Sequence, residues 1–346
     1  MSPPGRILAA AALAALCGGA ASGGSAADPF AWLAPSILLT PSQQAALDAG
    51  AVVVRALPAD DGHLGVFAAA RLEANPDALM AWTRAIADLV RGPLVNAAGR
   101  FSYEPVEADL EGLVLDDYDL DALRGCRPAD CDVKLTAAEI RQVRSAIDAA
   151  GPDWRGAAAG AFKRILIARV IAHRAGGLPA MPPDADRERP ASRYEAFAAI
   201  VTRSPYLADR LPQLASALET PSRAGIPGSE SLYYWSRERY GSGKAVIGVT
   251  HVRFWKPGTG PPAAIAASTQ IFASHYMEAA LGLMMVLCDT GDAPCYLAYI
   301  HRARVDLFGG LLGAIKRSIA RQRIGSQAPA LIRALRDRLQ TAAPPS

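Results

Sequence analysis

The chain has 346 residues, of which 51% are hydrophobic and 20% are charged, so it is long enough to bury a large core. Its formal net charge is only +3, which is too small an excess to indicate nucleic acid as a partner. We therefore expect a folded, globular protein that does not bind nucleic acid.

Residues 1–27 have the pattern of a secretory signal peptide. Arg6 supplies a positive charge, residues 7–16 are apolar, and small residues at 24–27 provide cleavage positions. The apolar stretch is shorter than the ~20 residues that a membrane-spanning helix needs. We predict cleavage near Ala26 or Ala27, which leaves residues 28–346 as one soluble domain in the periplasm or outside the cell.

Four cysteines remain after cleavage, and they form two close pairs in the sequence: Cys126 with Cys131, and Cys288 with Cys295. An even number of cysteines in an exported chain indicates disulfide bonds. Four cysteines allow three pairings, but a hairpin turn between Cys288 and Cys295 would bring these two face to face. Zinc sites usually have tighter cysteine spacing than this. We predict the two local disulfides, one in an acidic loop and one at a hairpin tip.

The mature chain begins with short elements. Thr40–Gln43 is a capping box that starts a helix ending at Gly50. Ala51–Leu57 and His63–Leu72 are rich in strand-forming residues and are joined by the turn-forming residues 60–62. Asn75 and Pro76 then start one helix that is expected to reach Gly92.

Residues 93–227 interrupt the β pattern and are predicted to form a helical insertion. We expect helices after the capping residue Thr136 and over Trp154–Ala175, Arg193–Thr202 and Tyr206–Leu218, with Pro212 kinking or splitting the last. Asp117–Asp121 imitates the start of a calcium loop but lacks its later glycine and glutamate. We interpret it as a solvated acidic loop.

Three β-type runs follow, at Ala245–Trp255, Ile265–Leu287 and Tyr296–Leu307, and residues 240–244 between the earlier chain and the first run are expected to form a turn. The middle run, about 23 residues, is much longer than the usual ~5–6, so the strand must bend. A basic helical segment, Gly309–Gln340, comes next. We predict an α+β fold in which a curved antiparallel sheet grips this C-terminal helix.

This order of elements resembles the START-like, helix-grip superfamily of ligand-binding domains. The matching parts are the strand and helix in His63–Leu89, the antiparallel strands from Tyr233 to Leu307, and the helix after Gly309. The resemblance implies a hydrophobic ligand, such as a lipid, sterol or polyketide, held between the sheet and the last helix. Members are mostly binders or carriers, and some are cyclases or hydrolases. The helical insertion departs from the family pattern, as does Pro329, which should kink or split the helix.

Odd-numbered residues of the long middle run are mostly apolar and should face inward. Together with the neighbouring strands they predict the wall of an adaptable cavity. The candidate ligand-binding residues are His251, Arg253, Trp255, His275, Met277, Leu281, Tyr299 and His301.

The three strand histidines do not predict a metal site. Hairpin pairing places His251 opposite the vicinity of Ser268 and His301 opposite the vicinity of Gly282, whereas His275 falls roughly 23 Å from either. Such a separation cannot form one coordination shell. We expect no metal or other cofactor, and no catalytic motif is recognised.

Charge is distributed unevenly: ten acidic residues lie between Glu104 and Asp132, and nine basic residues between Arg302 and Arg338. Either these are solvated faces that attract each other, or the basic helix contacts an anionic membrane or a partner. Leu311, Leu312, Ile315 and Ile319 recur at helical spacing, so that face should be buried against the sheet.

The expected function is the binding or carriage of a lipid-like ligand by an exported protein. Two alternatives remain open. An enzyme would use the same cavity through His251, Arg253, His275, Tyr299 and His301. A structural or envelope-interaction protein would use the charged faces as docking surfaces.

Overall fold

The computed structural model describes residues 28–59, 62–220, 225–239, 244–258, 260–288, 294–306, 313–341 and 344. Between 313 and 324, it describes the side chains of Ser318 and Gln322 alone. The predicted signal peptide lies outside the described residues. The predicted turns at 60–62, 240–244 and 289–294 lie mostly outside them.

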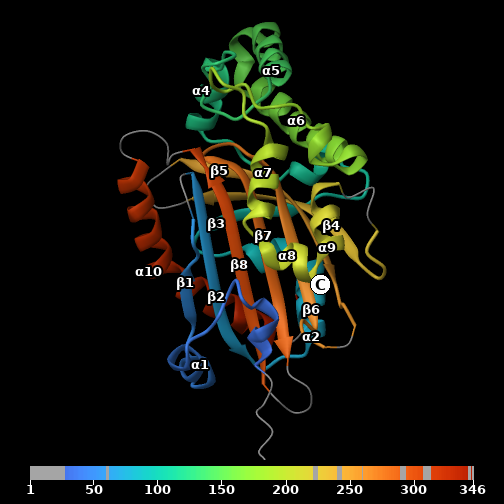
Figure 1. Ribbon diagram of the computed structural model, residues 1–346. Coiled ribbons are helices and arrows are strands. Elements are labelled where there is room, and N and C mark those ends of the chain that lie inside the picture. Colours follow the sequence, from blue (N-terminus) through green and yellow to red (C-terminus); the bar gives the residue numbers. More distant parts are fainter. Residues whose placement is uncertain are drawn as a thin grey trace, which may run out of the picture.

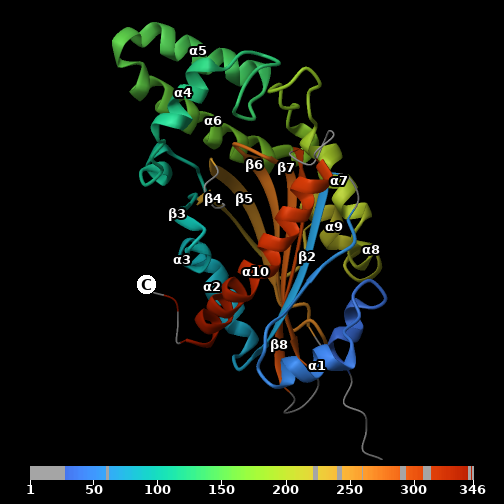
Figure 2. The ribbon, with the colours of Figure 1, turned by 90° about the vertical axis from the view of Figure 1, so that its left-hand side faces the viewer.

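The core of the fold is one eight-stranded antiparallel sheet with the order β1-β2-β8-β7-β6-β5-β4-β3. It is open and curved (Figures 1 and 2), so the predicted fold class is confirmed. Its strands are β1 (Val53–Ala56), β2 (His63–Leu72), β3 (Val95–Arg100), β4 (Glu230–Arg239), β5 (Ala245–Trp255), β6 (Ala264–Ala273), β7 (Met277–Cys288) and β8 (Cys295–Val305).

The predicted long strand is wrong: Ile265–Leu287 forms two strands, β6 and β7, which pair as a hairpin. The chain reverses at Ser274–Tyr276, where Met277 N–H donates to the His275 carbonyl at 2.7 Å and Tyr276 takes a left-handed φ of 65°. No glycine or proline marks this turn. The backbone N–H of Lys134, in the insertion, donates to the Ser274 carbonyl and holds the turn from outside the sheet.

One face of the sheet carries a continuous apolar core. The helices over it include α1 (Pro41–Asp48), α6 (Trp154–Gly176), α7 (Arg193–Thr202), α8 (Pro205–Arg210) and α9 (Pro212–Glu219), after a 3₁₀ turn at Pro29–Leu33. Figure 1 shows α7, α8 and α9 in front of the sheet. The odd-numbered residues of β7 from Ala279 to Leu287 are buried in this core, as predicted, whereas Met277 is only half-buried. Pro212 separates α8 from α9, also as predicted.

The opposite face is covered by α2 (Pro76–Arg84), α3 (Ile86–Val90) and the long helix α10 (Gly313–Gln340), as Figure 2 shows. The single helix predicted from Asn75 to Gly92 is two helices, because the chain leaves helical geometry at Ala85. α10 continues through Pro329 instead of being split there. Ile332 and Leu339 are buried; the side chains of Ile315 and Ile319 lie outside the described residues.

The insertion places α4 (Asp117–Gly125), α5 (Ala137–Ala150) and part of α6 beyond one end of the sheet (Figure 1). The expected acidic loop at Asp117–Asp121 is wrong, because it forms the start of α4 with Asp116 as its cap. The insertion is not purely helical either, since it includes β3, which pairs with β4 at the sheet edge.

The two charged segments do not pair with each other among the described residues. Acidic residues of the 104–132 segment pair instead with bases from the insertion, from β4 and from the position before β5: Glu107 with Arg164, Asp116 with Arg237, Asp117 with Arg155, and Asp132 with Lys244. Within the described ranges, no helix has both the length and the apolarity to cross a membrane.

A buried ionic network joins the insertion to the sheet. The two carboxylate oxygens of Asp184 contact Arg169 at 3.0 Å and Arg193 at 2.7 Å, and Glu139 binds Arg169 through both of its oxygens. Arg193 also donates to the Glu278 carbonyl at 3.1 Å, at the start of β7. Burial opposes the charge of Arg169, but Asp184 and Glu139 outweigh it and raise the pKa of that guanidinium.

Both predicted disulfides are confirmed. Cys126–Cys131 follows α4, and Cys288–Cys295 joins residues that are paired directly across β7 and β8. Two disulfides are compatible with an exported protein.

Replacing Asp184 with Asn should destabilise the protein by roughly 3–5 kcal/mol, because two buried arginines lose their shared counterion. Urea unfolding measures this. The matched control is Asp117→Asn, which removes an exposed pair with Arg155 and should change the unfolding free energy by less than about 1 kcal/mol. Similar effects of the two substitutions would show that the network does not hold the insertion in place.

Replacing both Cys288 and Cys295 with Ser should lower the unfolding free energy by roughly 2–3 kcal/mol, the value expected for closing so short a loop. Thermal unfolding with and without reductant tests this, since the reductant should no longer act at this site in the variant. Peptide mapping under non-reducing conditions would contradict the pairing if it found a 126–288 or 131–295 link.

Candidate functional site

The eight predicted ligand-binding residues do not form one wall. His251, Arg253, Trp255 and Leu281 lie on the face covered by the helices of the insertion, whereas Tyr299 and His301 lie on the face covered by α10. His275 and Met277 lie at the β6–β7 turn. The sequence placed these residues on one face because the middle run was treated as one strand, whereas it forms the two strands β6 and β7.

The strand pairing itself was predicted closely. His301 is opposite Gly282, as expected, and His251 is opposite Thr269, one residue from the expected Ser268. The five residues proposed for an enzyme are nevertheless distributed over three places, so the arrangement does not favour that alternative. Among the described residues, no group of three or more His, Cys, Asp or Glu side chains is arranged to hold a metal ion.

His251 belongs to a buried aromatic cluster that sequence reasoning missed. Its ring lies 4.6 Å from that of Tyr233 and 5.4 Å from that of His173, and His173 Nδ1 is 2.9 Å from the Tyr233 hydroxyl. Burial lowers the pKa of His173 to about 3 and also lowers that of His251, so both rings are neutral near pH 7. Recognising that β4 pairs with β5 would have placed Tyr233 beside His251.

The α10-facing side of the central strands has an unusual composition. We call seven of its residues the α10-facing wall: Gly248, Thr250, Ser268, Gln270, Gly282, Tyr299 and His301. On the opposite face, the same strands present large apolar residues, including Ile247, Val249, Ile271, Leu281 and Ile300. One face of these strands is therefore a filled core. The other face combines the small and polar side chains of the wall with a second apolar cluster under α2 and α3, which includes Val252, Phe254, Val286 and Leu297.

The polar side chains of this wall are neutral. The rings of Tyr299 and His301 are stacked, with centroids 6.3 Å apart. Burial lowers the pKa of His301 to about 4, and burial together with Glu238 raises the pKa of Tyr299 to about 12. Gln270 Oε1 is buried without a hydrogen-bond partner among the described residues. The wall thus offers hydrogen-bonding groups without charge.

α10 packs most closely against β1, β2 and α2. It crosses this face obliquely (Figure 2), and it contributes Ile332 to a small cluster with Ala68, Ala70 and Tyr299. The central strands from β8 to β5 therefore lie beside the closest contacts of the helix rather than directly under them.

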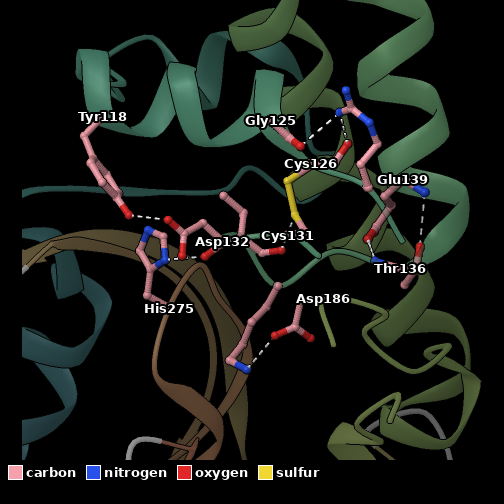
Figure 3. The surroundings of a disulfide bond; sticks show 12 residues. Tyr118, Gly125, Cys126, Cys131, Asp132, Thr136, Glu139, Asp186 and His275 are labelled. Carbon is pink, nitrogen blue, oxygen red and sulfur yellow. Dashed lines mark hydrogen bonds and ion pairs between the residues drawn. A yellow bond between two sulfur atoms is a disulfide. The ribbon is translucent and has the colours of Figure 1, made fainter. Parts of the chain in front are cut away.

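His275 lies in a different place, in a polar cleft of about 800 Å³ at the end of the sheet. Figure 3 shows its ring directed toward the chain around the Cys126–Cys131 disulfide, where its Nδ1 is 2.7 Å from the Asp132 carbonyl. None of the other seven predicted wall residues lines this cleft.

No family model, no curated protein and no solved structure matches the chain.

The neutral buried histidines predict how stability depends on pH. The unfolded chain binds a proton on each histidine near pH 6.5, but folded His173 does so only near pH 3, so stability must fall as the pH drops between these values. Replacing His173 with Gln should reduce this slope by up to about 1.4 kcal/mol per pH unit. Urea unfolding at pH 4.5, 5.5 and 7.5 measures it, and an unchanged slope would contradict the assignment.

Proposed function

We propose that this is an exported binding protein that holds a hydrophobic, lipid-like molecule between the α10-facing wall and α10. One observation carries the proposal. On the α10 side, the wall residues of the central strands include glycines and small polar residues, whereas on the other side the same strands present Ile, Val and Leu. Protein cores are close-packed, so a stretch of a sheet face that lacks bulky aliphatic side chains fits a bound molecule better than it fits a core.

The chemistry of the wall suggests the kind of ligand. Ala68 and Ala280 extend the small-residue surface and suit an aliphatic body. The neutral Tyr299–His301 pair and the free Gln270 Oε1 would receive a hydroxyl or carbonyl end through hydrogen bonds. A molecule with one small, uncharged polar end, such as a fatty alcohol or a sterol, combines both features.

The START-like pattern of the sequence supports this use of the sheet and last helix, and the predicted signal peptide and two disulfides support export. We also propose that the basic residues of α10, including the exposed Arg333, bring the protein to an anionic membrane from which the ligand is taken.

Protein purified from its native host should show bound lipid by native mass spectrometry, and delipidated protein should bind a fluorescent sterol. His301→Leu and Tyr299→Phe should each weaken that binding by roughly tenfold, about the effect of losing one hydrogen bond in an apolar site. Tyr194→Phe is the matched control, because it removes an exposed hydroxyl from α7, on the other side of the sheet. Folded protein that binds neither lipid nor probe, or equal affinities in all variants, would refute the proposal.

A further inference from the structure

A second site lies at the end of the sheet, apart from the α10-facing wall. We call it the disulfide cleft, because the chain after Cys126 forms one of its sides. α4 contributes Tyr118 and Asp121, the β6–β7 turn contributes His275 and Tyr276, and the ends of β5 and β8 add Lys244 and Asp306. Figure 3 shows Tyr118, Asp132 and His275 directed toward one another across it.

The cations of the cleft are already paired with carboxylates. Lys134 Nζ lies 2.7 Å from Asp306 and 3.3 Å from Asp186, and Arg187 lies 2.8 Å from the same oxygen of Asp306. Lys244 Nζ lies 2.8 Å from Asp132, whose other carboxylate oxygen accepts from the Tyr118 hydroxyl. These bases therefore have little charge left to attract an anion.

His275 lines the cleft and carries an unused acceptor. The residue is 3% exposed, and its Nδ1 faces a carbonyl oxygen, which can only accept, so Nδ1 carries the hydrogen. Burial lowers the pKa of the ring, which leaves Nε2 with a free lone pair near neutral pH. Nε2 is buried and has no hydrogen-bond partner among the described residues.

Asp306 provides a second unused acceptor. Lys134 and Arg187 both bind its Oδ2, while its Oδ1 is buried without a partner in the described part of the chain. The carboxylate side chain is only 4% exposed, so water reaches it poorly. Burying polar atoms without partners is costly, and such atoms in a cleft indicate that a ligand supplies the missing donors.

The charge of the cleft agrees with a donor-rich, positive ligand. Among its lining residues, five carboxylates face three cationic side chains, which leaves an excess of two negative charges. Asp121 and Asp130 are exposed and form no ion pair with other described residues, so the excess lies at the rim, where it attracts cations from solution. Ala129 and Tyr276, both in the cleft, hold positive φ values of 69° and 65°.

We propose that the disulfide cleft binds a small polar molecule that carries an ammonium group, which donates hydrogen bonds to His275 Nε2 and Asp306 Oδ1. An ammonium group has several N–H donors and a positive charge, which complement the two unused acceptors and the net negative charge of the cleft. The acceptors and the acidic rim both disfavour an anion. This site is independent of the lipid-like ligand proposed for the α10-facing wall.

Isothermal titration with two matched pairs of probes tests the inference. Glucosamine and putrescine should bind, whereas N-acetylglucosamine and 1,4-butanediol, which lack the ammonium group, should bind at least tenfold more weakly. Binding of the amines should weaken as salt is added, because the acidic rim is exposed. Equal binding within each pair, or no binding of either amine to folded protein, would overturn the proposal.

Two variants locate the binding. His275→Asn keeps a donor for the Asp132 carbonyl but removes Nε2, and it should reduce amine affinity at least tenfold. Asp121→Asn alters the exposed rim without disturbing the fold and should reduce affinity about two- to threefold, the effect of one screened charge. If His275→Asn does not fold, the ring signals of His275 in the wild-type NMR spectrum should still shift when putrescine is added. Signals that stay fixed while putrescine binds would place it elsewhere.

Discussion

The orientation of the insertion depends on one carboxylate, that of Asp184. Each of its oxygens binds a buried arginine, and Arg193 then reaches the carbonyls of Ala273 and Glu278 on both sides of the β6–β7 turn. Desolvating these charges is costly, and the cost is offset only when every partner is in place, so alternative dockings of the insertion are strongly disfavoured. The disulfide cleft lies directly beside this junction, and its shape is set by the same contacts.

The two faces of the sheet are packed differently. The side under α6 and α7 is a conventional core, in which large aliphatic and aromatic residues interlock. On the other side, α2 and α3 pack on a second apolar cluster that includes Phe254 and Val286, and α10 packs against β1, β2 and α2, whereas the residues of the α10-facing wall are small or polar. The filled core behind the α10-facing wall holds the wall rigidly. Little ordering of the protein is then required when a ligand binds.

The sequence correctly predicted the elements that local patterns mark, but it did not reveal the contacts between distant segments. The predicted bounds match the observed ones for β2, β5 and α7, which are His63–Leu72, Ala245–Trp255 and Arg193–Thr202. These elements are marked in the sequence by hydrophobic periodicity or by capping residues. The turn at Ser274–Tyr276 has no turn-forming residue and depends on the insertion, so no local pattern revealed it. That one omission moved His275 into a strand and joined two opposite faces into a single predicted wall. The disulfide cleft was missed for the same reason, since its sides come from α4, Asp186 and three strand ends.

The position of β2 has a consequence for how the chain folds. β2 lies between β1 and β8 in the sheet, so a strand formed near residue 65 must wait for a partner near residue 300. Closing so long a loop before the contact forms is entropically unfavourable, and sheets with such non-local pairing fold slowly. Until β8 is made, β1 and β2 can only form an isolated hairpin, which is marginal in water. The sheet can therefore be completed only once β8 is available, so this strand order favours late completion of the sheet over its growth from the beginning of the chain.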